Sequence, residues 1–140
     1  MLKLAFCEKM LELCNRLTAE GYPIVLCGDY NIAHTPLDLA RPKENENSAG
    51  YLPEERAWMS QFIAEGYIDI LREFEKENGH YTWWSYRARG ARSRNIGWRI
   101  DYHCCNQLLL SKVQGCKILK QILGSDHCPV KISLKSNIRS

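Results

Sequence analysis

The sequence has little that would place it in a membrane or in a disulfide-bonded framework. No apolar run approaches the ~18 residues of a bilayer-spanning helix, and charged residues near the N-terminus interrupt any export signal. The seven cysteines are an odd number without a C-x-x-C pair, which argues against disulfide bonds and a zinc ribbon and indicates an intracellular protein. Repeats and low-complexity segments are also absent. These absences predict one folded domain over residues 1–135 and a frayed tail at 136–140.

Acidic residues are missing from one stretch of the chain. The segment from Tyr81 to Arg99 contains five arginines and no aspartate or glutamate, so it carries +5 while the whole chain carries +3. Such a local excess predicts an anionic partner, and aromatic residues among arginines are typical of a nucleic-acid surface. The alternative is that the aromatic residues belong to the core while the arginines are only solvated. We expect a split, with at least Trp84 buried and the arginines exposed.

The distribution of apolar residues predicts an α/β fold. Apolar positions at helical spacing indicate amphipathic helices over residues 2–19 and from Pro53 to Gly66. Between them, the apolar run 24–27 indicates a buried strand, and the polar segment 32–52 indicates a long loop of the kind that is usually functional or disordered. The second half is predicted to be mainly β, with strands at 81–86, 98–105, 117–120 and 130–134 and an exposed basic loop at 87–97.

Three polar clusters close apolar runs, each where a predicted strand meets a loop. They are Gly28–Asn31, Arg99–Tyr102 and Ser125–His127. In open α/β sheets, ligands and catalytic groups gather at such strand ends. Together the clusters supply carboxylates, an amide and an imidazole, a set that suits metal-assisted phosphate chemistry.

The first cluster places Asp29 and Asn31 two residues apart, so both side chains can point to one side of the strand end. Asp29 can then accept a proton from a water molecule while Asn31 holds that water or a phosphate oxygen. An Asx turn explains the same residues equally well, because Asp-x-Asn after a strand is good turn chemistry.

The other two clusters supply the remaining candidates. Asp126 is a hard oxygen ligand of the kind that Mg²⁺ prefers, and His127 can donate to a phosphate in the transition state, although a plain turn is the favoured alternative. Asp101 lies inside an apolar run, where a carboxylate is costly unless it is paired. We expect it to hydrogen-bond His127, with a salt bridge to Arg99 as the alternative. The cysteines near His127 have the wrong spacing for a soft-metal site and are expected in the core.

Together these motifs resemble the exodeoxyribonuclease III family of apurinic/apyrimidinic endonucleases, within the endonuclease/exonuclease/phosphatase superfamily. The clusters Gly28–Asn31 and Ser125–Pro129 are marks of the superfamily and do not by themselves separate a DNA enzyme from an inositol phosphatase. The resemblance extends over nearly the whole chain. The more specific family marks are Ala49–Arg56, Thr82–Tyr86 and Ala91–Tyr102.

The resemblance implies a fold and an activity. The fold is the C-terminal half of a four-layer α/β sandwich of the DNase I-like type, with a mixed, mostly antiparallel sheet and two helices on one face. The implied activity is Mg²⁺-dependent hydrolysis of the phosphodiester 5′ to abasic sites in double-stranded DNA, with Mn²⁺ as a substitute cofactor. Further 3′–5′ exonuclease and 3′-phosphodiesterase activities are expected options. The implied location is cytoplasmic and nucleoid-associated in a bacterium, or nuclear in a eukaryote, with no membrane partner.

The resemblance also implies roles for individual residues. Asp29 matches the acid that orients or activates the attacking water, with Asn31 as its companion. Asp101 matches the acid that hydrogen-bonds the catalytic histidine, His127. The implied metal-site residues are Asp29, Asn31, Asp126 and His127. The implied DNA-contacting residues are Trp83, Trp98 and Ile100 in a pocket and Arg87, Arg89, Arg92, Arg94 and Asn95 in a loop.

One departure from the family pattern bears on activity. The upstream half, which in relatives supplies the principal metal-binding glutamate, an Asn/Asp pair and an active-site tyrosine, is not part of these 140 residues. We therefore expect the missing half to be a partner of this chain, and the chain alone to be inactive or weakly active. Two alternatives stay open. The isolated chain is an inactive DNA-binding fragment, or the protein is another phosphodiesterase or phosphatase of the superfamily.

Overall fold

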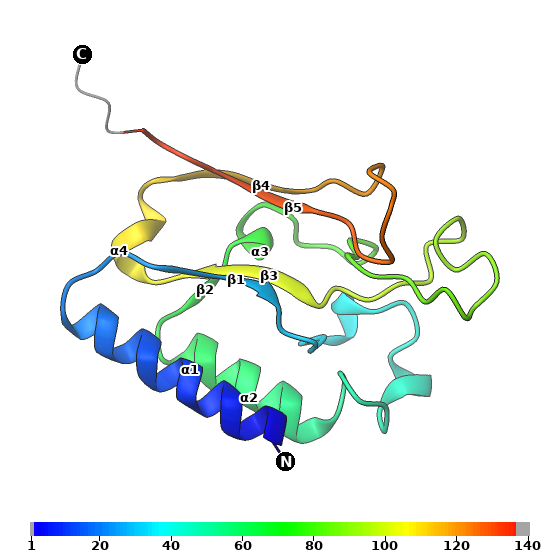
Figure 1. Ribbon diagram of the computed structural model, residues 1–140, viewed down its shortest axis with the longest axis horizontal. Helices are drawn as coiled ribbons and strands as arrows, with labels where there is room; N and C mark the ends of the chain where they lie inside the picture. Colours follow the sequence, from blue (N-terminus) through cyan, green and yellow to red (C-terminus); the bar gives the residue numbers. More distant parts are fainter. Residues whose placement is uncertain (1, 137–140) are drawn as a thin grey trace.

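The computed structural model describes residues 2–136, which form three layers (Figure 1). Two helices cover one face of a three-stranded sheet, and a two-stranded sheet packs against the other face. The strands of both sheets pair antiparallel. The fold is therefore mixed α/β with antiparallel sheets and two helices on one face, as expected. The tail predicted at 136–140 lies outside the described residues, except for Ser136.

The described elements include helices and strands along the whole length of the chain. The first sheet has the strand order β1–β3–β2, and the second consists of β4 and β5. No helix within residues 2–136 is both long and apolar enough to cross a bilayer. The elements are α1 (Leu2–Ala19), β1 (Val25–Asp29), the 3-10 turns η1 (Pro36–Asp38) and η2 (Lys43–Asn45), α2 (Pro53–Ala64), β2 (Ile68–Asp69), α3 (Leu71–Phe74), β3 (Asp101–Cys105), α4 (Gln107–Leu110), β4 (Val113–Ile118) and β5 (Val130–Leu134).

The two long helices form where the apolar spacing predicts them. α1 buries Cys7, Leu11 and Cys14, which share one face because residues three and four apart are neighbours on a helix. α2 begins with Pro53, which suits this position because the first N–H of a helix needs no partner within it. Phe62 of α2 is fully buried in the same core. Together the helices cover the first sheet from one side.

Residues 81–86 do not form the strand that their β-propensity predicts. Their strand-like pairings in the described chain are single bridges of Trp83 with Trp98 and with His127. The reason is packing, because Tyr81 and Trp84 belong to the same buried cluster although they are three residues apart, whereas alternation along a strand would place them on opposite faces. Trp84 is buried, as expected.

The structure also contains short elements that the sequence does not predict, and two strands begin at other residues than predicted. β2, α3 and α4 have two to four residues each, which is too short to display a hydrophobic period. β3 begins at Asp101 rather than at 98, and β4 begins at Val113 rather than at 117. The predicted strand at 130–134 matches β5.

One arginine of the basic segment lies in the core. Arg99 is 1% exposed, and its guanidinium donates to Asp38 Oδ1 at 2.8 Å and to the two oxygens of Asp69 at 2.9 and 2.5 Å. Arg72 donates to the same Asp38 oxygen at 2.5 Å. We call these four residues the buried ion cluster. The expectation that all five arginines are exposed is therefore wrong for Arg99, which is buried, and for Arg92, which is only partly exposed. The alternative salt bridge between Arg99 and Asp101 is also wrong.

Candidate active site

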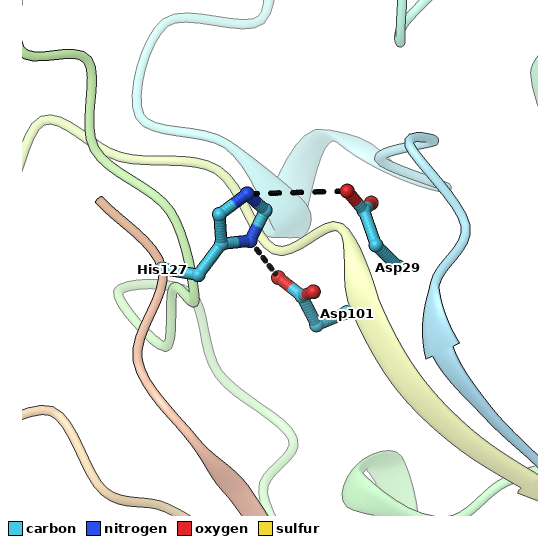
Figure 2. Close-up of side chains that lie close together, drawn as sticks. All are labelled: Asp29, Asp101 and His127. Atoms are coloured by element: carbon cyan, nitrogen blue, oxygen red, sulfur yellow. Dashed lines mark hydrogen bonds and ion pairs between the residues drawn. The ribbon is translucent and has the colours of Figure 1, made fainter. Parts of the chain in front are cut away.

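Three titratable side chains meet at one end of the first sheet (Figure 2). β1 ends at Asp29, β3 begins at Asp101, and the antiparallel register places these two residues opposite each other. His127 precedes β5 and is held nearby by its bridge to Trp83. His127 Nδ1 lies 2.8 Å from Asp101 Oδ2, and His127 Nε2 lies 3.9 Å from Asp29 Oδ2. We call Asp29, Asp101 and His127 the Asp–His–Asp cluster.

The hydrogen bond between His127 and Asp101 is the pairing expected from the sequence, and it changes the properties of the imidazole. Partial burial alone would lower the pKa of His127, but the hydrogen bond and the charge of Asp101 outweigh it, so the pKa is raised. Burial raises the pKa of Asp101, although hydrogen bonds to its carboxylate oppose the change. Because Nδ1 faces Asp101, Nε2 is the nitrogen directed toward Asp29 (Figure 2). A protonated His127 can donate from both nitrogens.

Asn31 adopts an uncommon backbone conformation beside the cluster. Its φ is +53°, and its N–H donates to Asp29 Oδ1 at 2.7 Å. This is the Asx turn that offered the alternative explanation for the pair. The two explanations are compatible, because the turn leaves Asp29 Oδ2 on the side of His127 and leaves Asn31 in the lining of a cavity. A positive φ at a residue other than glycine often marks a functional constraint.

A cavity of about 250 Å³ adjoins the Asp–His–Asp cluster. The Trp83 and Trp98 rings pack edge to face, with centroids 6.3 Å apart and planes at 82°. Asp101 hydrogen-bonds His127 through Nδ1 of the ring and does not line the cavity. All the lining residues except Ala49 are sequence-predicted candidates: Asp29, Asn31, Ala49, Trp83, Trp98, Ile100 and His127.

The donor atoms of the Asp–His–Asp cluster suit a divalent cation. Its two carboxylates and imidazole offer ligand atoms within 4.8 Å of one another, and carboxylate oxygens are preferred by hard cations. The side chain of Asp29 is 46% exposed, so a cation can reach it from the cavity. The cluster is therefore a candidate metal site as well as a candidate catalytic site.

Asp126 does not join the donor atoms of this site, although the sequence predicts it as a metal ligand. Its Oδ2 accepts a hydrogen bond from Trp83 Nε1 at 3.1 Å, and this bond lowers the pKa of Asp126. The bond also orients one wall of the cavity. Of the four predicted metal-site residues, the structure gathers Asp29, Asn31 and His127 around the cavity and directs Asp126 to Trp83.

The basic loop at 87–97 contains anchored and exposed side chains. Arg92 donates to three backbone carbonyls within residues 120–125, and its guanidinium lies over the Trp84 ring. Asn95 uses both ends of its amide, accepting from Trp84 Nε1 and donating to a backbone carbonyl. These two predicted DNA-contacting residues therefore also hold the loop in place. The exposed arginines of the loop are Arg87, Arg89 and Arg94, and Tyr86 just before the loop is exposed as well.

Two residues next to the site have no role in the sequence analysis. Thr82 is fully buried, and its Oγ1 accepts from the N–H groups of Ile100 and Asp101 at 3.1 and 3.2 Å, which fixes the start of β3. Glu55 is 1% exposed and accepts from two N–H groups of the loop before α2. Both residues lie within motifs that carry the family resemblance. The sequence does not show that these two polar side chains are buried, because their burial depends on segments far away in the sequence.

Known proteins match the sequence of this chain over most of its length. Residues 3–127 match the model of the endonuclease/exonuclease/phosphatase family. The chain is 46% identical over 111 residues to an exodeoxyribonuclease of Bacillus subtilis, covering 79% of this chain and 44% of that protein. It is 43% identical over 113 residues to the DNA repair nuclease APEX1 of Danio rerio, covering 80% of this chain and 36% of that protein.

Solved structures support the same relationship. The crystal structure of an AP endonuclease from Leishmania major superposes with a TM-score of 0.85 and 30% sequence identity, covering 94% of this chain and 43% of that chain. The described architecture therefore occurs within an AP endonuclease. The chain spans less than half the length of each of these relatives.

Proposed function

Because the chain belongs to the endonuclease/exonuclease/phosphatase family, we propose that it is part of a DNA repair nuclease that hydrolyses phosphodiester bonds at this cavity. The proposed substrate is double-stranded DNA with an abasic site, cut 5′ to that site. One observation carries the proposal: His127 is hydrogen-bonded to Asp101 at 2.8 Å beside a cavity with walls of Trp83 and Trp98. The imidazole offers a proton donor to a phosphate, and the indole rings offer apolar walls to a sugar without a base.

In this proposal Asp29 orients the attacking water and takes up its proton. The N–H of Asn31 holds Oδ1 of Asp29, which leaves Oδ2 on the side of the cavity. As the water oxygen bonds to phosphorus, the bond from phosphorus to the 3′ oxygen breaks. One fragment then carries a 5′-phosphate, and the 3′ oxygen of the other takes a proton from solvent to become a 3′-hydroxyl. The Asn31 side chain holds the water or a non-bridging phosphate oxygen.

His127 donates from Nε2 to a phosphate oxygen and stabilises the charge that develops in the transition state. Asp101 orients the ring through Nδ1 and raises the pKa of His127, so that the donating, protonated form persists to higher pH. Asp101 therefore acts as a positioning residue that does not itself line the cavity.

We propose Mg²⁺ as the cofactor, with Mn²⁺ as a substitute. The residues that would hold it are Asp29, through its exposed carboxylate, and Asn31, which lines the same cavity. His127, also predicted as a metal-site residue, is not a ligand in this proposal, because its protonated imidazole has no free nitrogen lone pair. When bound, the cation neutralises charge on the phosphate that is cleaved. Asp126 would have to leave Trp83 in order to join these ligands.

The proposed DNA contacts divide between the cavity and the basic loop. Trp83, Trp98 and Ile100 receive the abasic sugar, because they form the apolar lining of the cavity. The exposed arginines of the loop pair with phosphates, which positions the duplex without reading its sequence. These arginines are Arg87, Arg89 and Arg94.

The test is cleavage of an end-labelled duplex that contains a single abasic site by the whole nuclease of which this chain is proposed to be a part. We expect cleavage 5′ to that site with Mg²⁺ and none with EDTA. Asp29→Asn and His127→Ala should each lower the single-turnover rate by at least about 100-fold, the usual scale for losing an acid or base. His80→Ala is the matched control, because His80 pairs with Glu75 outside the cavity. Wild-type rates in either site variant would contradict the assignment.

The 140 residues alone are expected to cleave weakly, because the resemblance places a metal-binding glutamate outside them. Affinity for DNA is therefore a second readout. Trp98→Ala should weaken binding of the abasic duplex more than binding of an undamaged duplex of the same sequence. If the wild-type chain binds both duplexes equally and cleaves neither, it is a plain DNA-binding fragment and the proposed function is wrong.

A further inference from the structure

A lysine near the start of α1 reaches the backbone of the proposed site. Lys3 Nζ donates to the carbonyl oxygen of Asn31 at 2.5 Å and also to Glu55 Oε2. The Lys3 side chain is 25% exposed and that of Glu55 only 1%, so the ion pair lies between α1 and the start of α2. This contact links the first helix to a residue that lines the cavity.

Glu55 uses its second oxygen to hold the loop that precedes α2. Oε1 accepts from the N–H of Gly50 at 2.7 Å and from the N–H of Leu52 at 3.1 Å. A buried carboxylate is costly unless it has a charged partner and hydrogen bonds for its oxygens, and Glu55 has both. One carboxylate thus joins α1, α2 and the loop between η2 and α2.

The loop held by Glu55 forms a wall of the cavity. The carbonyl of Gly50 accepts from the N–H of Ala33 at 2.8 Å, just after Asn31. Gly50 has a φ of +96°, and a Cβ at this position would lie 3.1 Å from the Trp98 ring. The place of Gly50 therefore controls how closely the loop approaches both Asn31 and Trp98.

Asn31 is the residue on which these contacts converge. Its left-handed backbone conformation is uncommon, although asparagine adopts it more readily than other non-glycine residues, and hydrogen bonds hold it here. Asp29 holds its N–H at 2.7 Å, and Lys3 holds its carbonyl at 2.5 Å. Loss of Lys3 removes one of these two restraints.

We propose that Lys3 and Glu55 are positioning residues that set the orientation of Asn31 in the cavity. The proposal rests on the proposed function, in which Asn31 holds the attacking water or a phosphate oxygen. Both residues act through the backbone of Asn31 and of the loop before α2, and neither lines the cavity. Their loss should therefore slow the chemical step and leave substrate binding nearly unchanged.

The experiment compares Lys3→Met with Lys9→Met, the same substitution at an exposed lysine of the same helix. In the ¹⁵N-labelled chain, Lys3→Met should shift the backbone amide resonances of Ile32 and Gly50, whereas Lys9→Met should not. In the whole nuclease, with the abasic duplex and Mg²⁺, Lys3→Met should lower kcat roughly 10- to 100-fold at nearly constant KM. Lys3→Arg keeps a cationic donor and should restore most of the rate.

Two results would overturn this assignment: unchanged Ile32 and Gly50 resonances in Lys3→Met, or an equal loss of kcat in Lys9→Met. If the whole nuclease does not cleave abasic DNA, the proposed function fails, while the resonances still decide whether Lys3 sets the conformation of Asn31. Urea unfolding shows whether Lys3→Met remains folded. If it does not, Glu55→Gln is measured by the same criteria, with Glu54→Gln at an exposed neighbouring position as its control.

Discussion

The molecule contains two groups of aspartates that differ in exposure and in pairing. In the Asp–His–Asp cluster, the Asp29 side chain is 46% exposed and 3.9 Å separate its Oδ2 from His127 Nε2. In the buried ion cluster, Asp38 and Arg99 are each 1% exposed and joined by a hydrogen bond of 2.8 Å. The same residue type therefore serves in one place as an accessible acceptor and in the other as half of a closed ion pair.

The two clusters also shift carboxylate pKa values in opposite directions. Burial raises the pKa of Asp101, and the hydrogen bond from His127 does not reverse this change. Burial acts on Asp38 as well, but the adjacent Arg99 and Arg72 outweigh it and lower the pKa. Guanidinium partners thus keep a buried aspartate ionised for the fold, whereas Asp101 has a raised pKa and serves to orient the His127 ring.

Among the substitutions that distinguish the two clusters, Arg99→Met is expected to lower the free energy of unfolding most. This substitution leaves the buried Asp38 and Asp69 without their main cation, which should lower the free energy of unfolding by about 3–5 kcal/mol. Urea unfolding measures the loss. Arg87→Met, at an exposed arginine of the basic loop, should stay within about 0.5 kcal/mol of wild type. Equal effects of the two substitutions would mean that the buried ion cluster does not stabilise the fold.

An element can be predicted from the sequence when the residues that determine it are close together along the chain. Residues 2–19 and 130–134 match α1 and β5, because helical and alternating patterns are local. Residues 81–86 do not form a strand, because Tyr81 and Trp84 pack into one cluster instead of lying on opposite faces. Arg99 is misplaced by the sequence analysis for a related reason. Its partners Asp38 and Asp69 are 61 and 30 residues away in the sequence, so no pattern in the neighbouring residues predicts these contacts.

The candidate site was more accessible to prediction than the buried ion cluster. The hydrogen bond between His127 and Asp101 was expected, because a carboxylate in an apolar strand needs a partner. The sequence does not predict the hydrogen bond from Trp83 to Asp126. An aspartate in a polar turn does not indicate which side chain will donate to it. The catalytic roles of these residues stay predictions until activity is measured.

A second difference between the clusters concerns acid. The pKa of Asp38 lies below its ordinary value of about 3.9, so Asp38 contributes stability above that pH which is lost as the pH falls through its folded-state pKa. Urea midpoints between about pH 5 and pH 2.5 should therefore fall more in wild type than in Asp38→Asn. Glu44→Gln, at an exposed residue paired with Arg41, should keep the wild-type slope. Identical slopes for Asp38→Asn and wild type would refute this account.

The Asp–His–Asp cluster should show a smaller effect in the neutral range, because solvent screens partly exposed charges. The pKa of His127 lies above its ordinary value of about 6.5, so its contribution to stability is complete below that pH and is lost as the pH rises through the folded-state pKa. Asp101→Asn removes the main cause of the shift and should lower the pKa that NMR titration of the His127 ring proton reports. Glu75→Gln, at the partner of His80, should leave the His127 titration unchanged. An unaltered titration in Asp101→Asn would mean that Asp101 does not tune the imidazole.

The smallest effect on stability is expected for the substitution with a large effect on the proposed activity. Asp29→Asn keeps an oxygen that can accept from the N–H of Asn31, and the Asp29 side chain is 46% exposed. Its free energy of unfolding should therefore stay within about 0.5 kcal/mol of wild type, whereas Asp38→Asn should be clearly destabilising because it weakens the bonds to two arginines. Urea unfolding of the two variants side by side makes the comparison. A loss in Asp29→Asn as large as that in Asp38→Asn would show that Asp29 serves the fold, and the contrast between the two clusters would disappear.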